Sequence, residues 1–403
     1  MKRGRRWVGL VGLGLGLALG PTGISGGVAG GLGGGAPASA TPVSSIEVPV
    51  TIIQGQNGIT PTVRISLNGS EPLTVLLDSG SSGLVLGAEA VPATLEPSLT
   101  SLNTPVSRTY TSASVQGGLY SADMALLGGD GTAVGTWTAP LAIVSCQVAG
   151  CGWPRAGIVG VLGIGSGAQI IEGSGGETVL ASPFTTAANV TGVAFHFDSS
   201  SRSGAFWVGQ PYAAGATTFQ APAKQATYSN GLPVFWHYVA SCWTISSITA
   251  CDAYTTFDSG AEYGFIATSQ FEPLFGESTG PLPDGTQIAI SPTSNAPAVG
   301  TMTVSTPNFQ LRNDPGKSSE PLASNSGAGF LLDRDVVIDY QLGTVGIGEL
   351  GVNELGIAAS PPPNASGKVV ITIWSLAWWG LVGGFVAIVG VVGALGFWLR
   401  KTR

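Results

Sequence analysis

The sequence predicts an all-β protein built from two similar lobes, and three observations lead to this prediction. Gly, Ser, Thr, Ala and Val dominate the chain, and only 10% of its 403 residues are charged, which favours strands and turns over helices. No amphipathic helical pattern runs through the middle of the chain. An apolar or β-prone run ending in Asp-Ser-Gly occurs at residues 75–85 and returns at residues 254–262, 180 residues later. Such a repeat predicts two lobes, each presenting one carboxylate to a shared cleft.

The two ends of the chain differ from its middle. Residues 1–40 combine a basic start, an apolar run and Ala38-Ser39-Ala40, which is typical of a secretory signal peptide. Residues 369–399 contain no charged residue, and this run exceeds the ~20 residues that cross a bilayer as a helix. Basic residues in the tail 400–403 predict a cytoplasmic C-terminus. We therefore expect a single-pass protein of the cell membrane, partnered by the lipid bilayer, with residues 41–367 outside the cell.

The exported segment is acidic. Residues 41–367 hold eight basic residues against all 23 acidic ones, a net charge of −15. This balance argues against nucleic acid as a partner, although a soluble acidic surface explains the sign equally well.

The repeated motif points to a family. A single Asp-Ser-Gly is a common turn, but two copies at the ends of apolar strands are harder to explain by turn preference. Both copies resemble the hydrophobic-hydrophobic-Asp-Thr/Ser-Gly motif of pepsin-like aspartic proteases. The resemblance implies a bilobal pepsin-like acid protease fold and an aspartic endopeptidase that hydrolyses polypeptides without a cofactor or metal. It makes Asp78 and Asp258 the catalytic pair.

The same resemblance assigns supporting roles around the pair. Ser79 and Ser259 would cross-link the two loops beneath the acids, on the tight turns made by Gly80 and Gly260. Ser81 would hydrogen-bond the outer oxygen of Asp78. The matching position after Asp258 is Ala261, which has no hydroxyl. Loss of a hydrogen bond to a charged group is worth about 1.5 to 3 kcal/mol, so we expect altered titration of the pair with hydrolysis retained.

The elements expected in the first lobe, residues 41–200, follow from alternating apolar residues and turn-forming glycines. They are a hairpin over 46–67, a strand over 73–77, a second hairpin over 108–117, a strand over 119–127 and a buried Gly-rich strand over 157–165. By resemblance, the second hairpin is the flap with Tyr110 near its tip, and Gly163 packs beneath the Asp78 loop. Val85 stands where the family has a tryptophan, and a surface hairpin tyrosine remains an equal alternative for Tyr110.

The second lobe is expected over residues 201–351, with the boundary near Ser200. Strands over 193–197 and 205–209 resemble the pair that crosses between lobes, and further strands are expected over 234–238, 330–339 and 345–348. Gly327 matches the glycine beneath the second acid, but Asn325 and Ser326 replace two apolar residues of the family, which puts the support of this loop in doubt. A linker over 352–368 follows.

The four cysteines of an exported chain suggest disulfides, and three connectivities are possible. Spacing favours two local pairs, Cys146 with Cys151 and Cys242 with Cys251. A metal site is the alternative, but the sequence has no Cys-x-x-Cys and only two histidines, His196 and His237, which we expect on strand faces. We identify no nucleophile elbow that would support a serine hydrolase.

The main rival to a monomeric protease is a catalytically inactive pepsin-like fold that serves as a surface binding module. Ala261, Val85 and the altered flap favour this rival, whereas the presence of both acids favours the enzyme. A structural β-rich envelope protein is a remoter alternative, because it gives Asp78 and Asp258 no reason to converge.

Overall fold

The computed structural model describes most of the chain between residues 45 and 357. The described ranges are 45–55, 58–109, 114–146, 157–173, 176–187, 189–209, 211–213, 216–228, 230–266, 271, 280–305, 309–311, 324–349 and 355–357. The expected signal peptide (1–40) and membrane helix (369–399) lie outside these ranges. Within them, no helix is long and apolar enough to cross a membrane.

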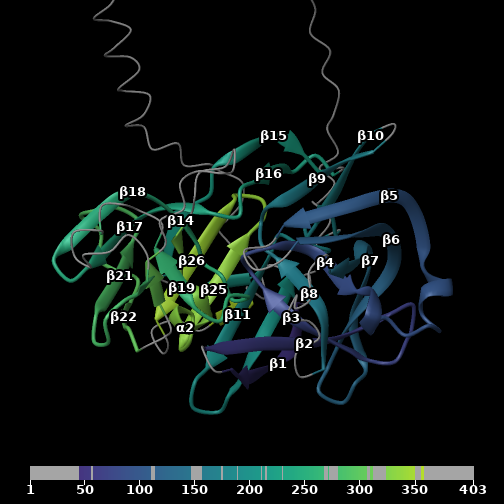
Figure 1. Ribbon diagram of the computed structural model, residues 1–403, viewed down its shortest axis with the longest axis horizontal. Coiled ribbons are helices and arrows are strands. Elements are labelled where there is room, and N and C mark those ends of the chain that lie inside the picture. The colour runs from purple at the N-terminus through teal and green to yellow at the C-terminus, as the bar shows by residue number, and fades with distance from the viewer. Residues whose placement is uncertain are drawn as a thin grey trace, which may run out of the picture. The chain divides into compact units, whose positions relative to one another are not determined.

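The described residues are almost entirely strands, so the all-β prediction is confirmed. Their single α-helix, α2 (Gly327–Phe330), has 4 residues, and two short 3-10 turns are η1 (Ala88–Ala90) and η2 (Glu96–Ser98). All described residues belong to one compact unit. Figure 1 shows the strands of the second half, β17, β18, β21 and β22, on one side, and β5, β6 and β7 on the other.

The first acid-bearing loop connects two strands, β3 (Leu73–Asp78) and β4 (Ser82–Gly87), and a third strand, β8 (Ile158–Ile164), passes between them beneath the loop. β1 (Ile46–Gln54) and β2 (Ile59–Leu67) form the expected hairpin, and β2 pairs with β3, whose last residue is the acid. β8 runs parallel to β3 and antiparallel to β4. A Cβ at Gly163 would lie 2.6 Å from the backbone nitrogen of Ser82, so only glycine lets β8 pass this close beneath the loop.

The hairpin proposed as the flap forms from β5 (Thr100–Thr109) and β6 (Ser114–Leu127), followed by β7 (Ala133–Cys146). The separate strand expected over 119–127 was wrong, because β6 continues unbroken from the hairpin. Glycine makes this possible: a Cβ at Gly117 would lie 1.8 Å from the carbonyl oxygen of Ile143 on β7. The tip, with Tyr110, lies outside the described residues.

The second acid-bearing loop repeats the arrangement of the first. β17 (Val239–Ile245) and β18 (Ile248–Thr256) form a hairpin, and Asp258 follows β18 directly. β24 (Ser324–Asn325) lies parallel to β18 and antiparallel to β19 (Gly264–Ile266), as β8 lies between β3 and β4. The two halves therefore build the same three-strand support from unrelated sequence.

Two strands expected in the second half differ from those observed. Of the run 234–238, only the first two residues lie in a strand, β16 (Pro233–Phe235), and Trp236, His237 and Tyr238 lie between β16 and β17. The run 330–339 begins as the end of α2 and becomes β25 (Arg334–Asp339) only later. Gly327 takes a φ of +68°, a left-handed conformation that turns the chain out of β24 and into α2.

Among the described residues, strands from the two halves join in a 13-stranded sheet. β11 (Gly192–Asp198) pairs with β25 (Figure 1), and β12 (Ser203–Gly209) pairs with both β11 and β1. β26 (Thr344–Glu349) and β14 (Thr217–Gln220) extend this sheet beyond β25. The hairpin that joins β11 to β12 is the region in which the lobe boundary was placed.

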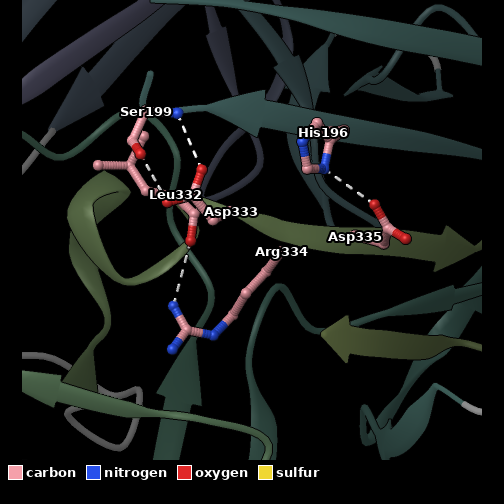
Figure 2. Close-up of polar contacts among 6 residues, drawn as sticks. All are labelled: His196, Ser199, Leu332, Asp333, Arg334 and Asp335. Atoms are coloured by element: carbon pink, nitrogen blue, oxygen red, sulfur yellow. Dashed lines mark hydrogen bonds and ion pairs between the residues drawn. The ribbon is translucent and has the colours of Figure 1, made fainter. Parts of the chain in front are cut away.

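Polar contacts fasten β11 to the start of β25, as Figure 2 shows. The backbone N–H and hydroxyl of Ser199 donate to the two carboxylate oxygens of Asp333, at 2.9 and 2.6 Å. His196 Nδ1 lies 2.9 Å from Asp335 Oδ1. Apolar side chains from both halves meet in one core cluster, in which Phe219 of β14 contacts Phe257 beside the second acid.

The remaining strands have six residues or fewer. They are β9 (Ala168–Gly173), β10 (Gly176–Ala181), β13 (Pro211–Ala213), β15 (Ala223–Thr227), β20 (Gly280–Pro281), β21 (Gln287–Ser291), β22 (Thr301–Thr303), β23 (Phe309–Leu311) and β27 (Leu355–Ile357).

Candidate active site

The two Asp-Ser-Gly loops face each other, and each carboxyl lies against the glycine of the opposite loop. A Cβ at Gly80 would lie 2.3 Å from the carboxyl carbon of Asp258, and a Cβ at Gly260 would lie 2.4 Å from that of Asp78. Any side chain at either glycine would overlap a carboxyl group. The structure therefore brings Asp78 and Asp258 together across a near-symmetric pair of turns.

Two serines lock the loops together beneath the acids. The backbone N–H of Ser79 donates to Ser259 Oγ, and the N–H of Ser259 donates to Ser79 Oγ, each at 2.9 Å. Each hydroxyl then donates across the interface, Ser79 to the carbonyl of Phe257 at 2.6 Å and Ser259 to that of Leu77 at 2.7 Å. Both serines are buried, so every polar group of this link is satisfied inside the protein.

The inner oxygen of each acid accepts the same two backbone hydrogen bonds. Asp78 Oδ1 accepts from the N–H groups of Gly80 and Ser81, at 2.8 and 3.1 Å. Asp258 Oδ1 accepts from those of Gly260 and Ala261, at 2.8 and 3.2 Å. These bonds fix the orientation of both carboxyl groups.

The outer oxygens have different donors. Ser81 Oγ donates to Asp78 Oδ2 at 2.6 Å, as the resemblance implied. Asp258 Oδ2 accepts from the carboxamide Nδ2 of Asn325, on β24, at 2.5 Å. Thus Asn325 contacts the oxygen that the missing hydroxyl of Ala261 leaves open.

The doubt about the support beneath Asp258 is resolved by side-chain hydrogen bonds. The N–H of Asp258 donates to Ser326 Oγ at 3.1 Å, and Ser326 Oγ donates to the carbonyl of Gly327. In the sequence, Asn325 and Ser326 stand out only as departures from an apolar pattern. The signal was nevertheless present, because two polar residues where the family has buried apolar ones require hydrogen-bond partners.

The electrostatics of the pair favour a shared proton. Burial, followed by the nearby Asp78 carboxylate, raises the pKa of Asp258, and the Asn325 hydrogen bond opposes this rise. Two like charges held this close cannot both ionise freely, and such a pair titrates as a unit. The arrangement can therefore hold one proton between two carboxyl groups at a pH where free aspartates have lost theirs.

The other predicted site residues have mixed outcomes. Cys242 and Cys251 form a disulfide across the β17–β18 hairpin, with an S–S distance of 2.04 Å, which confirms that predicted pair. Cys146 ends β7, but its side chain, like Cys151, lies outside what the structure describes. His196 lies on a strand, but the strand position expected for His237 was wrong, because it falls between β16 and β17. Among the described residues, no three His, Cys, Asp or Glu side chains cluster as a metal site would require.

Val85 is fully enclosed. It is 1% exposed and packs with Val106, Val115 and Leu119 of the β5–β6 hairpin. A cluster of small aliphatic residues therefore fills the place in which the family would have a tryptophan.

The fold is shared with a known protease. The structure is similar to the crystal structure of an aspartic proteinase from Irpex lacteus, with a TM-score of 0.52 and 17% sequence identity over 79% of this chain and 100% of that one. No family model and no curated protein matches the sequence. At this identity the similarity shows that the two proteins share the pepsin-like aspartic proteinase fold.

Proposed function

We propose that the protein is an aspartic endopeptidase that hydrolyses peptide bonds with a water activated between Asp78 and Asp258. One observation carries the proposal: each carboxyl lies against the opposite loop's glycine, within a pair of loops cross-linked by Ser79 and Ser259. This geometry gives two acids a common reacting position and holds it rigidly, which is what proton transfer in both directions requires.

The mechanism follows from one proton shared by two carboxyl groups. The ionised carboxylate takes a proton from the water, and the oxygen of that water attacks the carbonyl carbon of the peptide. The protonated carboxyl donates its proton to the carbonyl oxygen, so a tetrahedral intermediate forms without a covalent bond to the enzyme. Repulsion between the two like charges separates the two titrations, as in other aspartic-protease pairs, and so keeps one carboxyl protonated while the other is ionised.

We further propose that the enzyme is exported and held at the cell membrane by residues 369–399, as a monomer that acts on polypeptides outside the cell. The uncharged run of this segment and the basic residues that follow it support the tether. The acidic character of residues 41–367 supports a protein rather than a nucleic acid as substrate.

The test is cleavage of an unfolded protein at acid pH by the purified full-length chain, with and without a statine-type inhibitor of aspartic proteases. Asp78→Asn and Asp258→Asn should each remove nearly all activity while leaving the circular dichroism spectrum unchanged. Because the two acids act as one unit, the double variant should be little worse than either single variant. Substantial activity in either single variant would refute the assignment.

A binding module remains the second candidate, and Ala261 is the observation that favours it. The hydrogen bond from Asn325 to Asp258 weakens this case, because the outer oxygen has a donor after all. A folded wild-type chain that cleaves no unfolded protein between about pH 3 and 7, a range that covers the ~4 of a free aspartate and neutrality, would favour the module.

A further inference from the structure

The two acids receive their outer hydrogen bonds from different elements. Ser81 belongs to the first loop itself, whereas Asn325 belongs to the strand beneath the second loop. Pairing registers identify the matching residue in the first half: Val161 lies opposite Leu76 and Val85, as Asn325 lies opposite Thr256 and Phe265. The side chain of Val161 has no hydrogen-bond donor, and neither has that of Ala261. Each half therefore has one side chain that donates to the outer oxygen of its acid. In the first half this side chain lies on the loop after the acid, and in the second half it lies on the strand beneath the loop.

The orientation of the Asn325 carboxamide is fixed independently of the acid. The N–H of Gly327 donates to Asn325 Oδ1 at 2.8 Å, and a backbone N–H can only donate. The oxygen of the carboxamide must therefore face Gly327, which turns the NH₂ group toward Asp258. Asn325 is buried and its strand is paired on both sides, so the side chain has little freedom to turn away.

We propose that Asn325 is a positioning residue for the catalytic pair, which supplies from β24 the hydrogen bond that fixes the outer oxygen of Asp258. This inference rests on the proposed function and explains how the site tolerates Ala261. It also makes the two acids chemically unequal. A carboxamide NH₂ can only donate and favours an ionised Asp258, whereas the Ser81 hydroxyl can donate to Asp78 or accept from it.

The backbone at Ala261 is already arranged for a hydroxyl. Its N–H donates to Asp258 Oδ1 at 3.2 Å, as that of Ser81 donates to Asp78 Oδ1 at 3.1 Å. A serine at position 261 should therefore reach Asp258 Oδ2 as Ser81 reaches Asp78 Oδ2. The pair of changes Asn325→Val and Ala261→Ser would give the second half the donor pattern of the first.

The experiment compares the pH–rate profile of the full-length wild type with those of Asn325→Val and of Asn325→Val with Ala261→Ser. Loss of a hydrogen bond to the ionised carboxylate should raise the pKa of Asp258, the higher of the two titrations, and so move the basic limb of the kcat profile upward by about one to two pH units, with kcat lowered and KM little changed. Adding Ala261→Ser should reverse most of this shift. The introduced serine cannot replace Asn325 as the acceptor for the Gly327 N–H, so rescue separates positioning of the acid from support of the turn.

Ser326→Ala is the matched control. It removes a hydrogen bond beneath the same loop without touching the carboxyl oxygens, so it should lower the unfolding temperature and leave the basic limb in place. An unchanged basic limb in folded Asn325→Val, or a shift that Ala261→Ser does not reverse, would overturn the proposal. If Asn325→Val does not fold, Asn325→Asp keeps the acceptor for Gly327 and puts a carboxyl against Asp258, which should raise the titration of Asp258.

A measurement without turnover keeps this inference separate from the proposed function. The titration of the Asp258 carboxyl carbon can be followed by NMR in protein labelled with ¹³C-aspartate, and assigned by its loss in Asp258→Asn. Asn325→Val should move this titration upward, and Ala261→Ser should bring it back. If the wild type is inactive but the variants show these shifts, the proposed protease function is refuted and the role of Asn325 stands. If the wild type is active but the variants show no shifts, the protease function stands and the role of Asn325 is refuted.

Discussion

Ser79 and Ser259 show how much of the site depends on single hydroxyl groups. Each hydroxyl accepts one N–H and donates to one carbonyl of the opposite segment, and the two oxygens lie 3.2 Å apart. Alanine at either position would leave a buried donor and a buried acceptor without partners. These two residues therefore affect stability and the spacing of the acids together.

Ser79→Ala and Ser259→Ala should each lower the free energy of unfolding by about 2 to 3 kcal/mol, because buried polar groups lose their partners. The double variant should lose less free energy of unfolding than the sum of the two single variants. Once one serine is removed, the loops can separate and admit water, so removal of the second serine costs less. Urea unfolding measures all three values. Ser291→Ala is the control: this buried serine donates to one carbonyl away from the loops, so its loss should cost less. Strict additivity would contradict a shared link.

Asp258 makes a prediction about stability that does not require activity. Because burial and Asp78 raise its pKa, the folded protein binds more protons than the unfolded chain between about pH 4, the value of a free aspartate, and the raised value. Stability must therefore fall as pH rises through this window. Asp258→Asn removes the titration, so its unfolding temperature should decline less between about pH 4 and 8 and exceed that of the wild type at the upper end. Parallel curves for the two proteins would contradict the raised pKa.

At the residue scale, local sequence predicted the acids, the serines and the glycines, because each motif fixes its own turn and its own hydrogen bonds. It did not predict the donor to Asp258 Oδ2. That bond joins residues 67 apart, and it exists only because β24 passes between β18 and β19. A residue-by-residue comparison with the family marked Asn325 as a departure, whereas the three-dimensional pairing shows what it contacts.

At the scale of elements, each acid depends on a strand that arrives from far along the chain. β8 and β24 pass beneath their loops in the same manner, so glycine or a left-handed turn is required where the backbones cross. Hairpins were predicted well because both strands and the turn lie in one short stretch. The predicted strand boundaries were wrong at β6, β16 and β25. At these places, close approach to a neighbouring strand or the turn at Gly327 overrides the local sequence pattern.

The β17–β18 hairpin carries the disulfide between Cys242 and Cys251, which are 9 residues apart. Replacing both cysteines with alanine should lower the free energy of unfolding by about 2 to 3 kcal/mol, as expected for closing a loop of this length. The basic limb of the rate profile should stay in place, because β24 and the Ser79–Ser259 link hold the Asp258 loop independently. Urea unfolding and a pH–rate profile check the two statements. A shifted basic limb would mean that the hairpin positions Asp258 as well.

At the scale of the whole molecule, the charge balance suits an acidic environment. Residues 41–367 carry a net charge of −15, and this self-repulsion is relieved as carboxylates take up protons. The hydrogen bond that His196 makes to the carboxylate of Asp335 raises the pKa of His196. A raised histidine pKa gives stability that is complete below about 6.5, the ordinary value, and is lost as pH rises through the value in the folded protein.

Within the described part of the chain, few carboxylates have a lowered pKa that would make the protein less stable as pH falls. Hydrogen bonds from Ser200 and Ser201 lower the pKa of Asp198 to about 2, and those from Thr132 lower the pKa of Asp130. A lowered carboxylate pKa gives stability that is present above the ordinary value of about 4 and is lost as pH falls through the lowered value. The contribution of Asp198 is therefore lost only well below about pH 4, so moderate acidity leaves both His196 and Asp198 in their stabilising states.

The full-length enzyme should therefore work best on the acid side of neutrality, with a bell-shaped rate profile, and should stay folded there by circular dichroism. Activity requires the singly protonated pair, which forms as pH falls through the raised pKa of Asp258 and is lost when the second carboxylate is protonated. The basic limb should therefore lie above the pKa of a free aspartate and depend on Asn325, the donor to the outer oxygen of Asp258, whereas the acid limb should depend on Ser81, the donor to that of Asp78. His196→Gln, which cannot take up a proton, should flatten the loss of stability above neutral pH without moving either limb. Unfolding at mildly acid pH, or a rate that rises continuously above neutrality, would contradict a shared-proton pair in an acid-adapted protein.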